Sequence, residues 1–436
     1  MQPSKRISKF LGDSIFGEIT SLVPEGKAKN LGSGFTEWDT PQFLKDFLYQ
    51  GTLEHENQYG RSAGQIAFVK AIAKEYSPLF SREIDPMSEI VVTHGSTGGL
   101  TNACAAFLEE GDEVITFEPS FESYFVQPMI FGGKLRTFSL DQPKEGSDRW
   151  TVDFDEFEKI FNDKTRFLIL NTPHNPTGKV FTKKEMEQFA SIAKNWPRLI
   201  IITDEVYEHM CYNGNEHIRL GALDGMWDRV ISLYTASKVF SCAGWRVGWT
   251  IASAKLIEPL VAVQNWNNLN IHRPSQVAVA KTLEYVRSKP YQGDKYYYDY
   301  LREMLEKKKN FLVNVLKNSW IKMRVFEPEG GFFIVVDITE SIPLIPRQYF
   351  YKNGKIKDSE DLKETKELDN IDYSADYAFV RWLADKFNII SIPGYPFFDQ
   401  GHANSVKDYK GTHLVRFAFC KNDETLNAVA ECLLKK

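Results

Sequence analysis

Five short apolar runs alternate with segments of helical periodicity through the middle of the chain. The runs are Glu89–Thr93, Glu113–Phe117, Arg166–Asn171, Leu199–Thr203 and Val230–Tyr234. Most are continuously apolar rather than alternating, which is typical of strands covered on both faces. Between them, Thr182–Trp196 has helical periodicity, and Thr182 with Glu185 three residues later has the spacing of a capping box. This alternation of strands and helices predicts a mainly parallel α/β sheet.

The pattern changes toward the C-terminus. Residues 330–338, "GGFFIVVDI", predict a strand, Tyr377–Phe387 has helical periodicity, and His413–Cys420 alternates like a half-buried strand. The segment Tyr351–Asp372 is dense in charge and poor in apolar residues, which favours a solvated insertion or a mobile loop. We therefore expect an N-terminal arm at 1–44 that contributes to the small domain, a large α/β domain at 45–318 and a small α+β domain at 319–436.

Composition narrows the classes of function. The 436 residues are 43% hydrophobic and 25% charged with a net charge of −5, and no basic cluster indicates nucleic-acid binding. No apolar stretch is long enough to span a bilayer.

The five cysteines form no C-x-x-C pair, which favours a reducing compartment over a disulfide framework, and we expect no metal site. We expect a cytoplasmic protein; the basic, acid-free first twelve residues leave a mitochondrial presequence as the alternative.

Candidate chemistry follows the ends of the five strands, where α/β sheets bind ligands. Ser96 and Thr97 precede an apolar helix, so this position suits either a phosphate or an ordinary N-cap. Asp204 either caps a turn or holds a protonated ring nitrogen. Phe121 either packs in the core or stacks on a planar ligand. Turn geometry alone is enough to explain asparagine at positions 171 and 175.

Lys238 is the residue that a structural role explains least well. It follows the last strand among small residues, without an acidic neighbour in sequence, so it is expected to lose water and have a lowered pKa. A lysine of this kind is a candidate Schiff-base nucleophile. Arg246 lies in the apolar segment "AGWRVGW", where a fixed guanidinium suits a phosphate better than a surface ion pair.

Taken together, "NTPHNPTGK", "DEVYEH", "SKVFSCAGWRVGW" and the late arginine of "RF" resemble the fold-type I pyridoxal 5'-phosphate (PLP) aminotransferases of class I. The resemblance covers nearly the whole chain. It is nearest to the branch of kynurenine–oxoglutarate transaminase, glutamine transaminase K and cysteine-conjugate β-lyase. It implies a three-layer α/β/α large domain with a mainly parallel seven-stranded sheet, plus a smaller α+β domain.

The resemblance also implies a role for each matching residue. Lys238 would form the Schiff base and move the Cα proton, Asp204 would keep the ring nitrogen protonated, and Phe121 would stack on the ring. The other cofactor contacts would come from Tyr207 and Asn175 at the phenolic oxygen, and from Ser96, Thr97, Thr235 and Arg246 at the phosphate. The substrate site would consist of Arg416 on the α-carboxylate, with Asn175, the backbone of Gly34, Phe16 and Asn171.

Three implications concern substrates and assembly. Amino donors would be aromatic, glutamine-like or sulfur-containing amino acids, with kynurenine among the candidates, and a 2-oxo acid would accept the amino group in ping-pong fashion. A PLP-dependent β-lyase is the alternative main activity, and a non-enzymatic regulator with this fold is a remote one. Tyr59 would reach the phosphate of a neighbouring subunit, which implies a homodimer with shared active sites. Phe16 stands where the branch tends to have tryptophan, so the side-chain pocket departs from the branch pattern.

Overall fold

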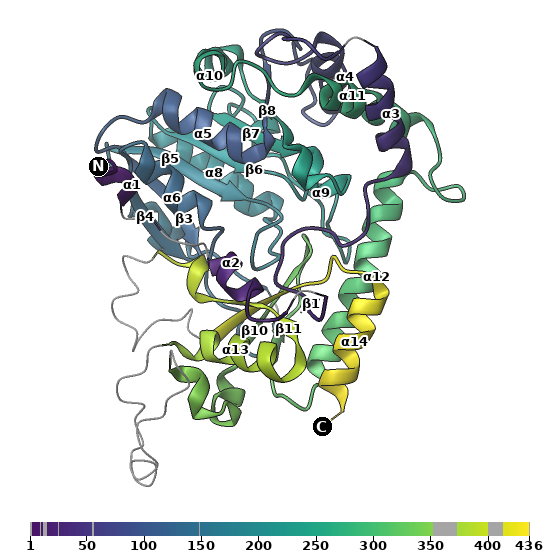
Figure 1. The fold of residues 1–436 in the computed structure, drawn as a ribbon. Helices are drawn as coiled ribbons and strands as arrows, with labels where there is room; N and C mark the ends of the chain where they lie inside the picture. Colours follow the sequence, from purple (N-terminus) through teal and green to yellow (C-terminus); the bar gives the residue numbers. More distant parts are fainter. Residues whose placement is uncertain are drawn as a thin grey trace.

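The computed structural model describes residues 2–435 except positions 9, 12–14, 25, 55, 148, 352–372 and 400–412. Its centre is a seven-stranded sheet in the order β2-β8-β7-β6-β5-β3-β4 (Figure 1). Only β8 runs antiparallel to its neighbours. The strands are β2 (Ile90–His94), β3 (Glu113–Glu118), β4 (Lys134–Ser139), β5 (Thr165–Asn171), β6 (Ile200–Asp204), β7 (Val230–Thr235) and β8 (Val247–Ile251).

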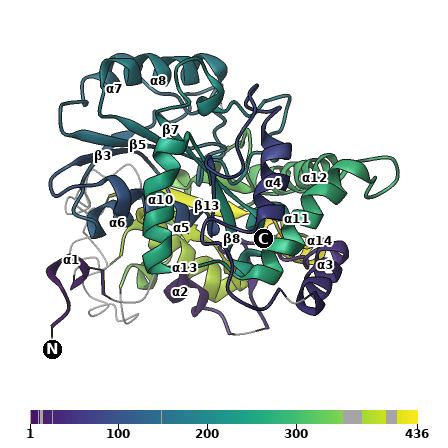
Figure 2. The same cartoon turned by 90° about the horizontal axis from the view of Figure 1, so that it is seen from above.

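Helices cover both faces of this sheet, which makes the three layers that the apolar runs predict. Figure 2 shows α7 and α8 on one side and α5, α6 and α10 on the other. Along β5, Leu168 and Leu170 belong to one core and Phe167 and Ile169 to the other. The helices of this part are α3 (Gln42–Leu53), α4 (Ile66–Tyr76), α5 (Gly95–Phe107), α6 (Ser123–Ile130), α7 (Phe154–Glu158), α8 (Lys183–Asn195), α9 (Ala236–Val239), α10 (Ala254–Asn267), α11 (Arg273–Ser288) and α12 (Tyr297–Lys317).

The C-terminal part forms a second, four-stranded antiparallel sheet in the order β12-β13-β10-β9. Its elements are β9 (Arg324–Phe326), β10 (Phe333–Asp337), α13 (Ala375–Phe387), β12 (Ile392–Pro393), β13 (Leu414–Ala418) and α14 (Asp423–Leu434). The expectation of a half-buried strand at His413–Cys420 is wrong, because all five residues of β13 are buried. β13 is an inner strand and is covered on both faces. Arg416, the polar residue that makes its sequence alternate, is therefore buried as well.

The N-terminal segment contacts both the large α/β part, through its first helix, and the C-terminal part. It contains α1 (Lys5–Ser8), α2 (Ile15–Thr20) and β1 (Lys29–Asn30), and β1 pairs in parallel with β11 (Ile389–Ile390). Five short 3-10 helices complete the described chain: Leu220–Ala222, Ala243–Trp245, Thr339–Leu344, Arg347–Phe350 and Tyr395–Phe397. The domain boundaries at 44/45 and 318/319 stay predictions, and the charged segment after Tyr351 lies outside the described residues.

Local signals at α8 are confirmed. The Thr182 side chain accepts a hydrogen bond from the backbone N–H of Glu185, and the Glu185 carboxylate accepts one from the backbone N–H of Thr182. Glu185 also pairs at 2.6 Å with Lys179, whose side chain is fully buried. The capping box therefore fixes the start of α8 directly after the turn that carries Asn175.

Candidate active site

A pocket of about 390 Å³ lies where the carboxyl ends of the parallel strands meet the four-stranded sheet. Twelve residues predicted from the sequence line it: Gly34, Ser96, Thr97, Phe121, Asn171, Asn175, Asp204, Tyr207, Thr235, Lys238, Arg246 and Arg416. The β2, β3, β5, β6 and β7 ends contribute to one wall, as expected for ligands outside the carboxyl edge of a sheet. Arg416 reaches the pocket from β13 of the other sheet.

Lys238 lies in α9, one short turn after β7. Its Nζ donates a hydrogen bond of 2.8 Å to the carbonyl of Gly34. Burial lowers the pKa of the Lys238 amine to about 8, and the charges of Arg246 and Arg416 act in the same direction, while Asp204 opposes them. A substantial fraction of the amine is therefore neutral near physiological pH, which is the form that acts as a nucleophile or base.

Asp204 ends β6 and is only 6% exposed. Burial raises the pKa of its carboxyl to about 6, although the hydroxyl of Tyr124 opposes the shift by donating a 2.7 Å hydrogen bond to Oδ2. Sequence reasoning did not identify Tyr124. Its place three residues after Phe121 was visible, but the contact joins the first turn of α6 to the end of β6, which are far apart in the chain.

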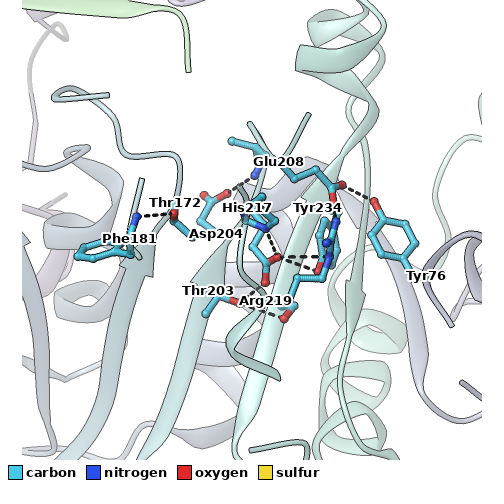
Figure 3. A network of polar contacts seen from close by, with 12 residues as sticks. Tyr76, Thr172, Phe181, Thr203, Asp204, Glu208, His217, Arg219 and Tyr234 are labelled. Atoms are coloured by element: carbon cyan, nitrogen blue, oxygen red, sulfur yellow. Dashed lines mark hydrogen bonds and ion pairs between the residues drawn. The ribbon is translucent and has the colours of Figure 1, made fainter. Parts of the chain in front are cut away.

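Behind Asp204, a buried polar network ties β6 to β7 (Figure 3). Consecutive strand residues point to opposite sides, so Asp204 lines the pocket while Glu205 enters the network. Glu205 accepts hydrogen bonds from Thr203 Oγ1 at 2.7 Å and from Tyr234 OH at 3.0 Å, and it pairs with His217 at 2.6 Å. These contacts immobilise the strand end that presents Asp204.

Further ion pairs extend this network away from the pocket. Arg219 pairs with Glu208, which also accepts a hydrogen bond of 2.5 Å from the hydroxyl of Tyr76. Figure 3 shows this chain of contacts from Arg219 through Glu208 to Tyr76. The buried carboxylates in the network are thus paired with cations and hydroxyl groups, as burial of charge requires.

Arg416 is 2% exposed and is held from both sheets. Its Nη1 donates to Asn175 Oδ1 at 2.9 Å, and its Nη2 donates to the carbonyl of Gly32 at 2.8 Å. Gly34 also lines the pocket, and its carbonyl accepts from Lys238, so its support of the α-carboxylate clamp stays a prediction. Burial lowers the pKa of Arg416 to about 10, so the guanidinium is still charged at neutral pH.

Asn171 braces this arrangement through both ends of its side chain. Its Oδ1 accepts from the backbone N–H of Asn175 at 2.6 Å, and its Nδ2 donates to the carbonyl of Asp204 at 2.8 Å. The amide of Asn171 is thus occupied within the protein, although the residue lines the pocket. It holds Asn175, whose Oδ1 faces Arg416, in a fixed position.

The part of the pocket formed by the start of α5 and by Arg246 suits an anion. The first turn of α5 presents the backbone N–H groups of Ser96 and Thr97, and Arg246 lies beside it, where its Nη2 donates to the His94 carbonyl at 3.2 Å. Arg246 makes no ion pair among the described residues. A Cβ on Gly95 would lie 2.6 Å from Arg246 Nη2, so only glycine permits this approach.

Three sequence predictions need separate comment. The hydroxyl of Thr235 donates to the Val247 carbonyl at 3.0 Å and caps α9, while Ser237, which the sequence did not single out, also lines the pocket. Tyr59 is 80% exposed and does not line the pocket of its own chain. The side chain of Phe16 lies outside the described part of the chain.

Six other lining residues were also not predicted from the sequence. They are Ser33, Phe35, Glu122, Tyr124, Val206 and Phe333. Val206 stands within "DEVYEH", beside the predicted Asp204 and Tyr207, and the others reach the pocket through tertiary packing.

Comparisons with known proteins agree on one family. The family model described as "Aminotransferase class I and II" matches residues 28–432. Kynurenine–oxoglutarate transaminase of Dictyostelium discoideum is 35% identical over 447 residues, covering 100% of this chain and 96% of that protein. Kynurenine–oxoglutarate transaminase 3 of Mus musculus is 34% identical, covering 98% of this chain and 89% of that protein.

Two solved structures are also similar. YbdL from Escherichia coli, described with a methionine aminotransferase function, has a TM-score of 0.83 at 27% identity and covers 100% and 99% of the two chains. N-Succinyldiaminopimelate aminotransferase from Mycobacterium tuberculosis has a TM-score of 0.82 at 28% identity and covers 99% and 98%. Among the described residues, no helix has the length and apolar character needed to cross a membrane.

The lowered pKa of Lys238 predicts its reactivity in the unliganded protein. Reductive methylation with formaldehyde requires the neutral amine, so its rate at Lys238 should rise about tenfold per pH unit and level off above about pH 8. The protein's exposed lysines should keep gaining reactivity toward the ordinary lysine pKa of about 10.4. Peptide mass mapping after timed reactions measures both profiles in one sample. A Lys238 profile that coincides with that of the exposed lysines would contradict the assignment.

Proposed function

The chain belongs to the class I and II aminotransferases, and on that premise we propose which residues carry the reaction and which substrates they take. Transfer of an amino group from an amino acid to a 2-oxo acid is the activity of the family, and membership implies PLP as cofactor. The observation that carries the residue assignment is the meeting of Lys238, Asp204 and Arg416 in one pocket built from both sheets.

The residues present fit PLP. Arg246, without an acidic partner among the described residues, and the first turn of α5 suit its phosphate dianion. The aromatic side chain of Phe121 suits a planar ring, and the buried carboxyl of Asp204 suits a protonated ring nitrogen. The lowered pKa of Lys238 suits reaction with an aldehyde. We propose Ser96, Thr97, Thr235 and Tyr207 as the further cofactor contacts.

Binding and orientation of the substrate are assigned to Arg416 and Asn175. The guanidinium of Arg416 offers a planar pair of donors to the α-carboxylate, and Asn175 and Gly32 fix its plane. Because Arg416 is buried, its attraction for a carboxylate is screened little by solvent. Every α-amino acid and 2-oxo acid carries this carboxylate, so Arg416 sets the orientation that all substrates share.

Proton transfer is assigned to Lys238. When bound, PLP supplies the aldehyde and the electron-withdrawing ring that make the Cα–H bond acidic. The neutral Nζ of Lys238 then takes the proton from the substrate Cα and gives it up again in the same pocket. The carboxylate of Asp204 would hold the protonated ring nitrogen, and Tyr124 keeps that carboxylate fixed by its hydrogen bond. A 2-oxo acid leaves before the second one enters, which gives ping-pong kinetics.

We propose aromatic, glutamine-like and sulfur-containing amino acids as donors, with kynurenine among them. The similarity to kynurenine–oxoglutarate transaminases and to a structure with a methionine aminotransferase function supports this range. The aromatic side chains of Phe35, Phe121 and Phe333 line the pocket and suit apolar substrate side chains.

Single-turnover product analysis distinguishes transamination from β-elimination. With a cysteine S-conjugate as the only substrate, the holoenzyme should release the corresponding 2-oxo acid and retain the amino group, so free ammonia stays near background. A β-lyase would instead release pyruvate and ammonia without any oxo-acid acceptor. Stoichiometric ammonia in the first turnover would therefore count against transamination as the main activity.

We propose a homodimer with shared active sites because three large apolar side chains are exposed on the surface. We call them the rim, and they are Tyr59, Trp266 and Leu269. Their exposed fractions are 80%, 91% and 47%. Arg273 joins the two parts of the rim, because its Nη1 donates to the Tyr59 carbonyl at 3.0 Å and it begins the helix that follows Leu269. Large apolar side chains gathered at the surface are typical of interfaces. A partner copy packed here would bring Tyr59 toward a neighbouring phosphate.

Replacement of Arg416 by glutamine should lower kcat/KM by about 100-fold or more for every α-amino acid, since loss of one partner of a buried charge pair costs about 2–5 kcal/mol. Steady-state kinetics with phenylalanine, methionine and glutamine measure this. Arg381→Gln is the matched control, because the hydrogen bonds of Arg381 within the described residues go to the backbone carbonyls of Tyr349 and Tyr351 outside the pocket. A loss confined to acidic amino acids would disprove the role in α-carboxylate binding.

Replacement of Trp266 by glutamate should break the dimer, because a buried charge opposes packing at the rim. Light scattering coupled to size-exclusion chromatography should show a shift from twice the chain mass to 50.1 kDa. Leu344→Glu serves as control, since Leu344 is 48% exposed in the C-terminal part and away from the rim. An unchanged mass for Trp266→Glu would remove the rim from the proposed interface.

A further inference from the structure

One acidic residue of the pocket has no part in the mechanism above. Glu122 directly follows Phe121 and stands at the N-cap of α6. It lines the same pocket as Arg416 and Phe333, and its side chain is half-buried. Asp204 is the carboxylate that is proposed to bind the cofactor. Glu122 has no proposed contact with the cofactor, so it is available to the substrate.

The described residues give Glu122 no other role. An acidic N-cap residue ordinarily accepts a hydrogen bond from the first turn, but the Glu122 side chain makes no such bond. Within the described part of the chain, its carboxylate forms no hydrogen bond or ion pair. Burial raises the pKa of Glu122, and the charge of Arg416 opposes this shift, which places the carboxylate within electrostatic range of the substrate-binding arginine.

The distribution of charge in the pocket determines what a second substrate carboxylate would meet. Three cationic side chains line the pocket in the described residues: Lys238, Arg246 and Arg416. Each has a proposed task at the Cα proton, the phosphate or the α-carboxylate. Among the described lining residues, no further cation would then be left to pair with an acidic side chain of the substrate. That side chain would instead meet the carboxylate of Glu122, and like charges in a partly desolvated site repel strongly.

A neutral side chain with a donor group meets the opposite situation. The unpaired oxygens of Glu122 are strong hydrogen-bond acceptors, and the amide of glutamine or an aromatic amine carries N–H donors. Loss of water from Glu122 on binding is then compensated by a hydrogen bond. The residue thus favours one group of substrates and opposes another through the same carboxylate.

We propose that Glu122 is a specificity-determining residue that rejects amino acids and 2-oxo acids with an acidic side chain and accepts a hydrogen bond from neutral, donor-bearing side chains. This inference rests on the proposed function, because it assumes that Arg416 binds the α-carboxylate. It implies that the efficient amino acceptors are neutral 2-oxo acids, and that 2-oxoglutarate is a poor one for this chain.

Glutamine and glutamate form a matched pair for the test, since they differ only in an amide against a carboxylate. For the wild-type holoenzyme, kcat/KM should be about tenfold or more higher for glutamine. In Glu122→Gln, kcat/KM for glutamate should rise about tenfold, mainly through a lower KM, and 2-oxoglutarate should improve equally as acceptor. Glu122→Asp, which keeps the charge, should keep the wild-type preference.

Controls separate this inference from the function beneath it. Phenylalanine carries neither a charge nor a donor, so its kcat/KM with pyruvate should stay within about twofold in Glu122→Gln and report correct folding. Glu109→Gln removes an exposed carboxylate outside the pocket and should leave the glutamine-to-glutamate ratio unchanged.

Absence of amino transfer from phenylalanine in wild type would overturn the proposed function. Normal transfer with an unmoved ratio in Glu122→Gln, or a wild type that prefers glutamate, would overturn the role of Glu122 alone.

Discussion

The hydrogen bond between Asn175 and Arg416 joins the two sheets across the pocket, and the rest of the site is arranged around it. Asn175 follows β5 of the large sheet, and Arg416 lies in β13 of the small one. Because Asn171 fixes Asn175 and also binds the carbonyl of Asp204, the arginine proposed to bind the substrate and the buried carboxylate share one rigid support. The contact therefore ties the position of Arg416 to the turn that follows β5.

Burial is the common cause of the electrostatic properties of the site. It lowers the pKa of Lys238 to about 8 and of Arg416 to about 10, and it raises that of Asp204 to about 6. The same desolvation therefore gives an amine that is partly neutral at physiological pH, an arginine that stays charged, and a carboxyl whose pKa lies closer to neutral pH than usual. The network of Glu205, behind the strand end, keeps the backbone fixed while these groups carry unfavourable burial.

Sequence reasoning found the parts of the site that follow from chain order. Strand ends of a parallel sheet share one edge, so the positions of Lys238 and Asp204 in one pocket could be predicted from the apolar runs that precede them. Contacts between remote segments could not. Tyr124 reaches Asp204 across the sheet, and the carbonyl that binds Arg416 Nη2 belongs to Gly32, shortly after β1 pairs with β11.

The same reasoning explains why family membership specifies the two halves of the pocket unequally. The cofactor half requires a nucleophile, a buried carboxyl and an anion site at fixed spacings, so it leaves recognisable motifs in the chain. The substrate half needs only complementary charge and shape, which single residues such as Glu122 supply without a motif. A relative at 35% identity can therefore belong to the same family and still differ in the side chains it accepts. If Glu122 has the proposed role, the charge balance of this pocket decides which acceptor is preferred.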